Sequence, residues 1–143
     1  MWKFFLTAVS LVCALMLGSG SAHAALEPER ILVFDVKKQE VVKKIDNTPA
    51  LQAEAKNWLG TITGLSPRVH LGMDKGLVVK IPMDPPTRVE NQWMNDEITE
   101  IDLILRPGEK PAMLLFSEDN QARVFEFSHD VDKFLRKTHL RYQ

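Results

Sequence analysis

The amino-acid sequence predicts an α+β domain, in which an antiparallel β-sheet of hairpins and a C-terminal meander carries two packed helices. Segments between Glu97 and Phe127 alternate apolar and polar residues, as half-buried strands do. Short turns separate these segments, which favours antiparallel neighbours over long crossovers. Two other segments repeat apolar residues at helical spacing, and they are the predicted helices.

The first predicted element is a hairpin. Ile31–Val36 and Val41–Ile45 are its strands, and the polar residues 37–40 form its turn. The lysines that follow the turn suit a solvated face or an exposed edge, where charge discourages pairing with another chain. The predicted core face of the first strand consists of Leu32, Phe34 and Val36.

A helix is predicted to begin at Pro49, because Thr48 can cap it and proline fits the first helical position. Gly60 and Gly64 limit its length, and the helix is expected to end between them. Trp58 is interpreted as a core residue rather than a ligand platform. The apolar stripe of this helix consists of Leu51, Ala55, Trp58, Leu59 and Ile62.

A second hairpin and a proline-rich connection are predicted in the middle of the chain. Arg68–Met73 and Leu77–Ile81 are the expected strands of the hairpin. Pro82–Thr87 is expected to be an extended loop, since its three prolines cannot donate to a strand ladder. A strand over Arg88–Met94 and a turn at Asn95–Asp96 lead to the C-terminal half.

The C-terminal meander is predicted over Glu97–Leu105, Ala112–Phe116 and Ala122–Phe127. In the first strand, the mixed face predicted to be solvated consists of Ile98, Glu100, Asp102 and Ile104. The opposite face of that strand consists of Thr99, Ile101, Leu103 and Leu105. The second strand is almost wholly apolar, which predicts a central position with both faces covered, and the third points Phe125 and Phe127 inward.

The closing helix is predicted to start at Ser128 as its cap, with Asp130 in its first turn. The expected buried face of this helix consists of Val131, Phe134, Leu135 and Thr138.

Residues 1–24 indicate a cleavable secretory signal peptide. Lys3 provides a positive start, and the apolar run Phe4–Leu17 has 14 residues, fewer than the roughly 20 that span a bilayer. The expected cleavage site is defined by Ala22, Ala24 and Ala25. Cleavage leaves residues 25–143 as one small domain with no transmembrane anchor.

Net charge and cysteine content indicate the compartment of the protein and limit its expected partners. Removal of 24 residues from the 143-residue chain leaves 119, with 17 Lys and Arg against 19 Asp and Glu, a net charge of −2. Without a basic excess, nucleic acid is not an expected partner. The one cysteine, Cys13, lies in the leader, and a cysteine-free mature chain fits a bacterial cell envelope or medium better than a eukaryotic extracellular space.

The sequence assembles no catalytic, cofactor or metal motif. His129 lies among acidic residues, but no cysteine or second nearby histidine completes a zinc set, and helix capping explains the cluster. His70 is an isolated strand histidine. No phosphate-binding glycine loop or serine elbow is present. No catalytic residue, cofactor or metal is therefore predicted.

A sheet edge and two segments are candidates for binding a partner, which is a protein, an anionic envelope polymer or lipid head groups. The basic face of the closing helix consists of Lys133, Arg136, Lys137 and Arg141. The proline segment and a nearby tryptophan form the second candidate, with Pro82, Pro85, Pro86 and Trp93. The structural alternative for the basic face is solvated charge at a helix C-terminus. The structural alternative for the proline segment is a rigid connector between two hairpins.

These observations favour a secreted or extracytoplasmic, non-enzymatic binding domain of a bacterial cell envelope or medium. One alternative is a small hydrolase whose site assembles His70, His129 and carboxylates from distant parts of the chain. Another is an accessory or inhibitory subunit of a second exported protein.

Overall fold

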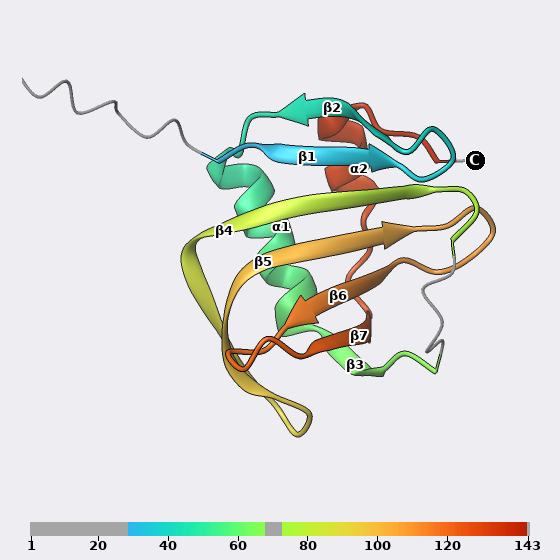
Figure 1. The fold of residues 1–143 in the computed structure, drawn as a ribbon. Helices are drawn as coiled ribbons and strands as arrows, with labels where there is room; N and C mark the ends of the chain where they lie inside the picture. The colour runs from blue at the N-terminus through green and yellow to red at the C-terminus, as the bar shows by residue number, and fades with distance from the viewer. Residues whose placement is uncertain (1–28, 68–72, 143) are drawn as a thin grey trace, which may run out of the picture.

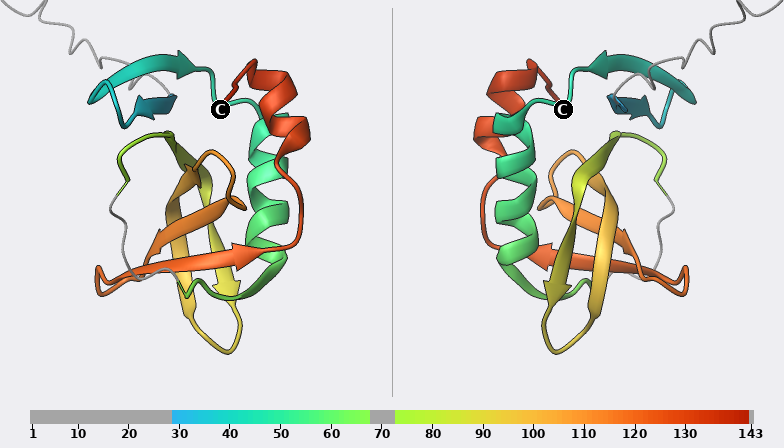
Figure 2. Two further views of the ribbon diagram at one scale, coloured as in Figure 1. Left: turned by 90° about the vertical axis from the view of Figure 1, so that its right-hand side faces the viewer. Right: turned by 90° about the vertical axis from the view of Figure 1, so that its left-hand side faces the viewer.

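The computed structural model describes residues 29–67 and 73–142. The leader, its cleavage site, His70 and most of the predicted strand at 68–73 lie outside the described residues. One seven-stranded antiparallel sheet carries two helices on the same face, which confirms the predicted α+β class (Figures 1 and 2). The sheet is open, with strand order β2-β1-β4-β5-β6-β7-β3.

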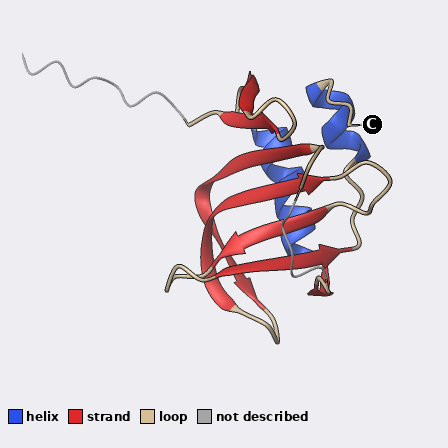
Figure 3. Ribbon diagram, turned by 45° about the vertical axis from the view of Figure 1, so that its right-hand side comes forward, coloured by secondary structure: helices blue, strands red, loops and turns tan. Residues whose placement is uncertain are grey.

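The elements follow one another in the chain as β1 (Ile31–Asp35), β2 (Glu40–Ile45), α1 (Pro49–Gly60), β3 (Ile62–Leu65), β4 (Leu77–Glu90), β5 (Asn95–Leu105), β6 (Ala112–Phe116), β7 (Ala122–Phe127) and α2 (Asp132–Thr138). Figure 3 shows the bend of the long strands β4 and β5 before their shared turn. Among the described residues, neither helix has the length and apolarity needed to cross a membrane.

Helix α1 forms as predicted at its start and on its buried face. Thr48 Oγ1 accepts a hydrogen bond from Leu51 N at 3.3 Å, and Pro49 occupies the first turn. The helix ends at Gly60, so Ile62 does not extend its stripe but pairs with Phe127 at the β3 edge.

Trp58 is the central aromatic of the core, as predicted. Its ring is fully buried and lies 5.1 Å from the ring of Phe134 and 5.9 Å from that of Phe127. Trp58 Nε1 donates to Asp130 O at 3.1 Å, so the buried indole N–H has a partner. This side chain therefore joins α1 to β7 and to α2.

The predicted core face of β1 is wrong. Ile31 and Val33 are fully buried, whereas Leu32 and Phe34 are only half-buried on the open face. Every residue from Ile31 to Phe34 is apolar, so alternation cannot choose the inward set. The position of the helices on one side of the sheet makes that choice. Val36, beyond the strand, is buried as predicted.

Two predictions for the first part of β4 are wrong. Residues Leu77–Lys80 pair with β1 on one side and β5 on the other, so no edge remains for the predicted second hairpin. The proline segment is not a loop but part of β4, because the ladder is interrupted between Pro82 and Thr87 and the prolines need not donate there.

The turn between β4 and β5 begins at Asn91, not at Asn95–Asp96. Asn91 Oδ1 accepts hydrogen bonds from Trp93 N at 2.8 Å and Met94 N at 3.0 Å. This side-chain turn ends β4 before the predicted limit at Met94.

The C-terminal meander forms as β5, β6 and β7, with two corrections. Ile98 is buried although it was expected on the solvated face, because the burial alternation of β5 shifts at Thr99, opposite the interrupted ladder of β4. Strand β6 is interior as predicted, but Phe116 is exposed and one face of the strand is not fully covered.

The start of α2 also differs from the prediction. The N-cap residue is Val131 and no side chain caps the helix, so Ser128 is not a cap. Asp130 Oδ1 instead accepts from Asp132 N at 3.0 Å in the turn before the helix. Phe134 and Thr138 are buried as predicted, and the ring of Phe134 packs against Trp58 of α1.

Candidate functional site

The outer side of α2 and the tail that follows it carry three exposed basic residues. Arg136, Lys137 and Arg141 take part in no ion pair within residues 29–67 and 73–142. Lys133 differs, because its Nζ lies 3.3 Å from Glu54 Oε1 and its charge is partly compensated. Within the part of the chain that the structure describes, the predicted basic face thus has one cation in an ion pair and three outside any ion pair.

Edge strand β2 joins this helix at its C-terminal end. Lys43 Nζ donates to Thr138 O at 2.6 Å, so a lysine of the first hairpin satisfies a terminal carbonyl of α2. The sequence gave no indication of this contact, which spans 95 positions. We call the combined region the basic surface; its members are Lys37, Lys38, Lys43, Arg136, Lys137 and Arg141. Lys44 pairs with Leu32 and therefore points to the opposite face of the sheet from Lys43.

A buried carboxylate lies beneath one end of α2. Glu54 of α1 has a side chain that is only 4% exposed, and its Oε2 is 3.1 Å from His129 Nε2. Burial acts to raise the pKa of Glu54, but the hydrogen bonds and positive charges of His129 and Lys133 outweigh it and hold that pKa below its usual 4.5. Sequence reasoning missed Glu54, although it follows Leu51 by three positions and so falls within the apolar stripe.

The cluster around His129 is largely accounted for by these contacts. His129 bonds to Glu54, and Asp130 accepts from the backbone of Asp132. Among the described residues, no group of three His, Cys, Asp or Glu side chains is arranged to hold a metal ion. His129 also lines a pocket of about 420 Å³ together with Lys110, Ser128 and Tyr142.

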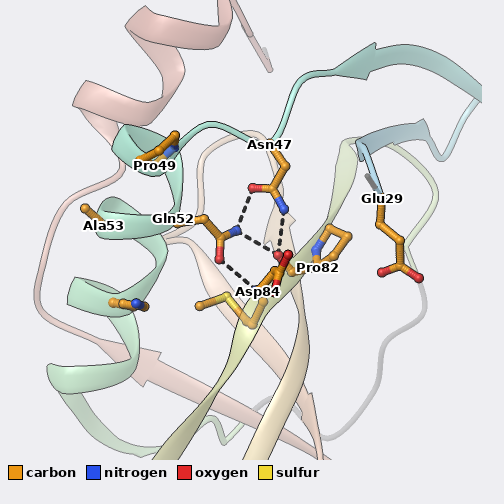
Figure 4. Close-up of a pocket in the computed structure, with 9 residues that line it drawn as sticks. Glu29, Asn47, Pro49, Gln52, Ala53, Pro82 and Asp84 are labelled. Carbon is orange, nitrogen blue, oxygen red and sulfur yellow. Dashed lines mark hydrogen bonds between the residues drawn. The ribbon is translucent and has the colours of Figure 1, made fainter. Parts of the chain in front are cut away.

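A pocket of about 610 Å³ separates α1 from the bend of β4 (Figure 4). The pocket is lined by Glu29, Asn47, Pro49, Gln52, Ala53, Lys56, Pro82, Met83 and Asp84. Gln52 Nε2 donates to Pro82 O at 2.7 Å and to Asn47 Oδ1 at 2.6 Å, and its Oε1 accepts from Asp84 N at 3.1 Å. Asn47 Nδ2 also donates to Pro82 O, at 2.9 Å.

This network holds the proline segment against α1, and its polar atoms satisfy one another. One wall of the pocket is therefore fixed by these hydrogen bonds. Pro82 is buried in that wall, whereas Pro85 and Pro86 are exposed. Trp93 is half-buried in the β4–β5 turn, with Thr87–Glu90 of β4 between it and the prolines. The prolines and Trp93 are thus separate features.

On the open face of the sheet, Asp102 has a raised pKa. Burial, and then the neighbouring charge of Glu100, raise the pKa of Asp102 from 3.8 to about 6, while Lys80 acts in the opposite direction. Lys80 Nζ lies 3.3 Å from Glu100 Oε2. Asp102 is therefore less well solvated than the sequence predicted for this face.

Comparison with known proteins gives no match, whether with protein-family models, with curated proteins or with solved structures. A functional proposal therefore depends on the residues and geometry of this chain.

Proposed function

We propose that the protein is an exported, non-enzymatic binding domain that attaches to an anionic partner of a bacterial cell envelope through the basic surface. The observation that supports this proposal is the Lys43–Thr138 hydrogen bond, which joins the lysine-bearing β1–β2 hairpin to the cations of α2 and its tail. An anionic partner would compensate cations that have no carboxylate partner within the described residues. Export is supported by the leader pattern of residues 1–24.

Export is tested by producing the full chain in a bacterial host and separating cytoplasm, envelope and medium. The mature protein should be recovered outside the cytoplasm with Ala25 as its first residue. Retention of the uncleaved chain in the cytoplasm would contradict this part of the proposal.

Attachment is tested with the processed protein and a soluble polyanion, dextran sulfate. Arg136→Gln/Lys137→Gln/Arg141→Gln should weaken binding by about 100-fold at low ionic strength, and added salt should weaken binding of the wild type. Lys56→Gln is a matched control for Lys137→Gln, because both are exposed helical lysines outside the ion pairs of the described chain. Equal loss in the two single variants would contradict attachment through the basic surface.

A small hydrolase is a second candidate, favoured by one observation. The buried Glu54 carboxylate holds the ring of His129 through Nε2, and this ring lines the 420 Å³ pocket. A carboxylate-bound imidazole can act as a general base toward a water or hydroxyl group. His129→Gln should abolish turnover of any ester or amide substrate found in a chromogenic panel. Unchanged turnover in that variant would exclude this site.

A further inference from the structure

We infer that the anionic partner is a lipid bilayer surface, and that Val41 and Val42 enter its interfacial layer while the basic surface contacts the head groups. This inference depends on the proposed function, because it names the partner of the same surface. Three features of the structure carry it: an exposed apolar pair, its position among the cations, and the uneven charge distribution of the molecule.

The exposed apolar pair lies on edge strand β2. Val41 is 45% exposed and Val42 is 42% exposed. In a regular strand, consecutive side chains point to opposite faces. Here Val33 pairs with Lys43 and the next residue, Phe34, pairs with Val41. Val42 is therefore the extra residue of a β-bulge. The bulge therefore allows two adjacent valines to remain in solvent together.

Lysines flank this pair on both sides in the sequence. Lys37 and Lys38 lie in the β1–β2 turn, and Lys43 and Lys44 follow the valines. Glu40 is the exposed carboxylate within this stretch. On the other side of the Lys43–Thr138 bond lie the cations of α2 and its tail. A soluble polyanion would require cations alone, whereas exposed apolar side chains flanked by lysines along an edge strand match the layer between lipid head groups and acyl chains.

The opposite end of the molecule is acidic. Asp96 and Glu97 at the start of β5 lie against the β6–β7 turn, where Glu118 N donates to Asp96 Oδ1 at 3.2 Å and Glu97 N donates to Glu118 Oε1 at 3.1 Å. In Figure 1 these segments lie at the end of the sheet away from β1, β2 and α2. Two arginines also lie at this end, where Arg88 Nη1 is 3.8 Å from Glu118 Oε1 and Arg123 donates to Trp93 O. The carboxylates outnumber them, so an anionic surface would attract the end with β1, β2 and α2 and repel this one.

The experiment is cosedimentation of the processed protein with vesicles, because the leader run Phe4–Leu17 would itself enter a bilayer. Vesicles of phosphatidylcholine with about one-third phosphatidylglycerol are compared with pure phosphatidylcholine vesicles and with dextran sulfate. Each basic residue near an anionic bilayer contributes about fivefold to partitioning. The wild type should therefore bind the anionic vesicles at least about 100-fold more tightly than the neutral ones.

Val41→Thr/Val42→Thr separates a bilayer from a polymer. Threonine keeps the β-branched shape of valine in an exposed strand, and the hydroxyl groups should reduce binding to anionic vesicles by roughly tenfold. Binding to dextran sulfate should not change. Leu65→Thr is the matched control, since Leu65 is 51% exposed on the other edge strand and should affect neither.

Two other outcomes would contradict the bilayer assignment or the proposed function. Vesicle binding that is insensitive to Val41→Thr/Val42→Thr, together with tight binding of dextran sulfate, would overturn the bilayer assignment and leave the proposed function standing as attachment to a polymer. Failure to bind either anionic vesicles or dextran sulfate would overturn both. A thermal unfolding curve for each variant confirms that the change is one of binding.

Discussion

Replacing Glu54 by glutamine tests whether its buried carboxylate stabilises the packing of α2 on α1. The carboxylate lies 3.1 Å from His129 Nε2 and 3.3 Å from Lys133 Nζ, while only 4% of its side chain is exposed. Glutamine has nearly the same volume but presents one oxygen and one NH₂ group. Either His129 or Lys133 would therefore face the NH₂ group, which is itself a donor.

The expected loss of stability follows from how exposed the side chains of Glu54, His129 and Lys133 are. A hydrogen bond to a charged group contributes about 1.5–3 kcal/mol, whereas an exposed ion pair contributes about 0–1 kcal/mol. The side chains of His129 and Lys133 are 35% and 59% exposed, so solvent weakens both contacts. We expect Glu54→Gln to lower the free energy of unfolding by about 2 kcal/mol at neutral pH, and Lys133→Gln by about 0.5 kcal/mol.

The pH dependence has a definite sign. The pKa of Glu54 is lower in the folded chain than its usual 4.5, so folding favours the charged form. The contribution is complete above pH 4.5 and is lost as the pH falls through the folded pKa. The difference between Glu54→Gln and the wild type should therefore shrink on acidification below pH 4.5.

Urea unfolding followed by tryptophan fluorescence measures this loss, because Trp58 is buried against Phe134. For a domain of this size, 2 kcal/mol corresponds to a midpoint lower by about 1 M urea. Lys56→Gln, on the exposed side of the same helix, should leave the midpoint unchanged. Equal midpoints for Glu54→Gln and the wild type at neutral pH, or a difference that persists undiminished at about pH 2, would refute the reasoning.

Three further predictions concern stability. Asp102→Asn should raise the free energy of unfolding at pH 7 by about 1–2 kcal/mol after allowance for solvent screening, because the folded pKa is raised from 3.8 to about 6 and charging of Asp102 costs stability as the pH rises between these values. The stability difference between the variant and the wild type in urea titrations should therefore be larger at pH 7 than at pH 3.5, and an equal difference at both pH values would contradict the prediction. Gln52→Ala should cost about 2–3 kcal/mol in the same assay, since it removes partners from Pro82 O and Asp84 N, and a loss below about 0.5 kcal/mol would show that water replaces them. The fragment 25–143 should unfold cooperatively on its own by circular dichroism, whereas aggregation would favour an obligate partner.

Much of the fold could be predicted because its signals are local. The Thr48–Pro49 start of α1 depends on one hydrogen bond and one φ preference within a single turn. The meander from β5 to β7 depends on alternation and short turns. Errors occurred where local signals were balanced or misleading, as in the all-apolar stretch of β1 and the prolines of β4.

The candidate surface was predicted only in part. The cations of α2 and its tail were recognised from charge alone, and Lys133 then proved to be paired with Glu54. The lysines of the first hairpin were interpreted as a solvated edge, because no sequence pattern relates Lys43 to Thr138. The exposure of both Val41 and Val42 depends on a bulge in the β1–β2 register.

The sequence by itself determined the α+β class, the start and buried face of α1, the order of the C-terminal strands and the identity of the charged residues. These features depend on the conformational preferences and periodicity of neighbouring residues. The tertiary structure alone decided which face of β1 is buried, that Glu54 lies beneath His129 and Lys133, and that Lys43 of the first hairpin bonds to the end of α2. Each of these results depends on contacts between residues far apart in the chain, and such contacts form only when the helices pack against the sheet.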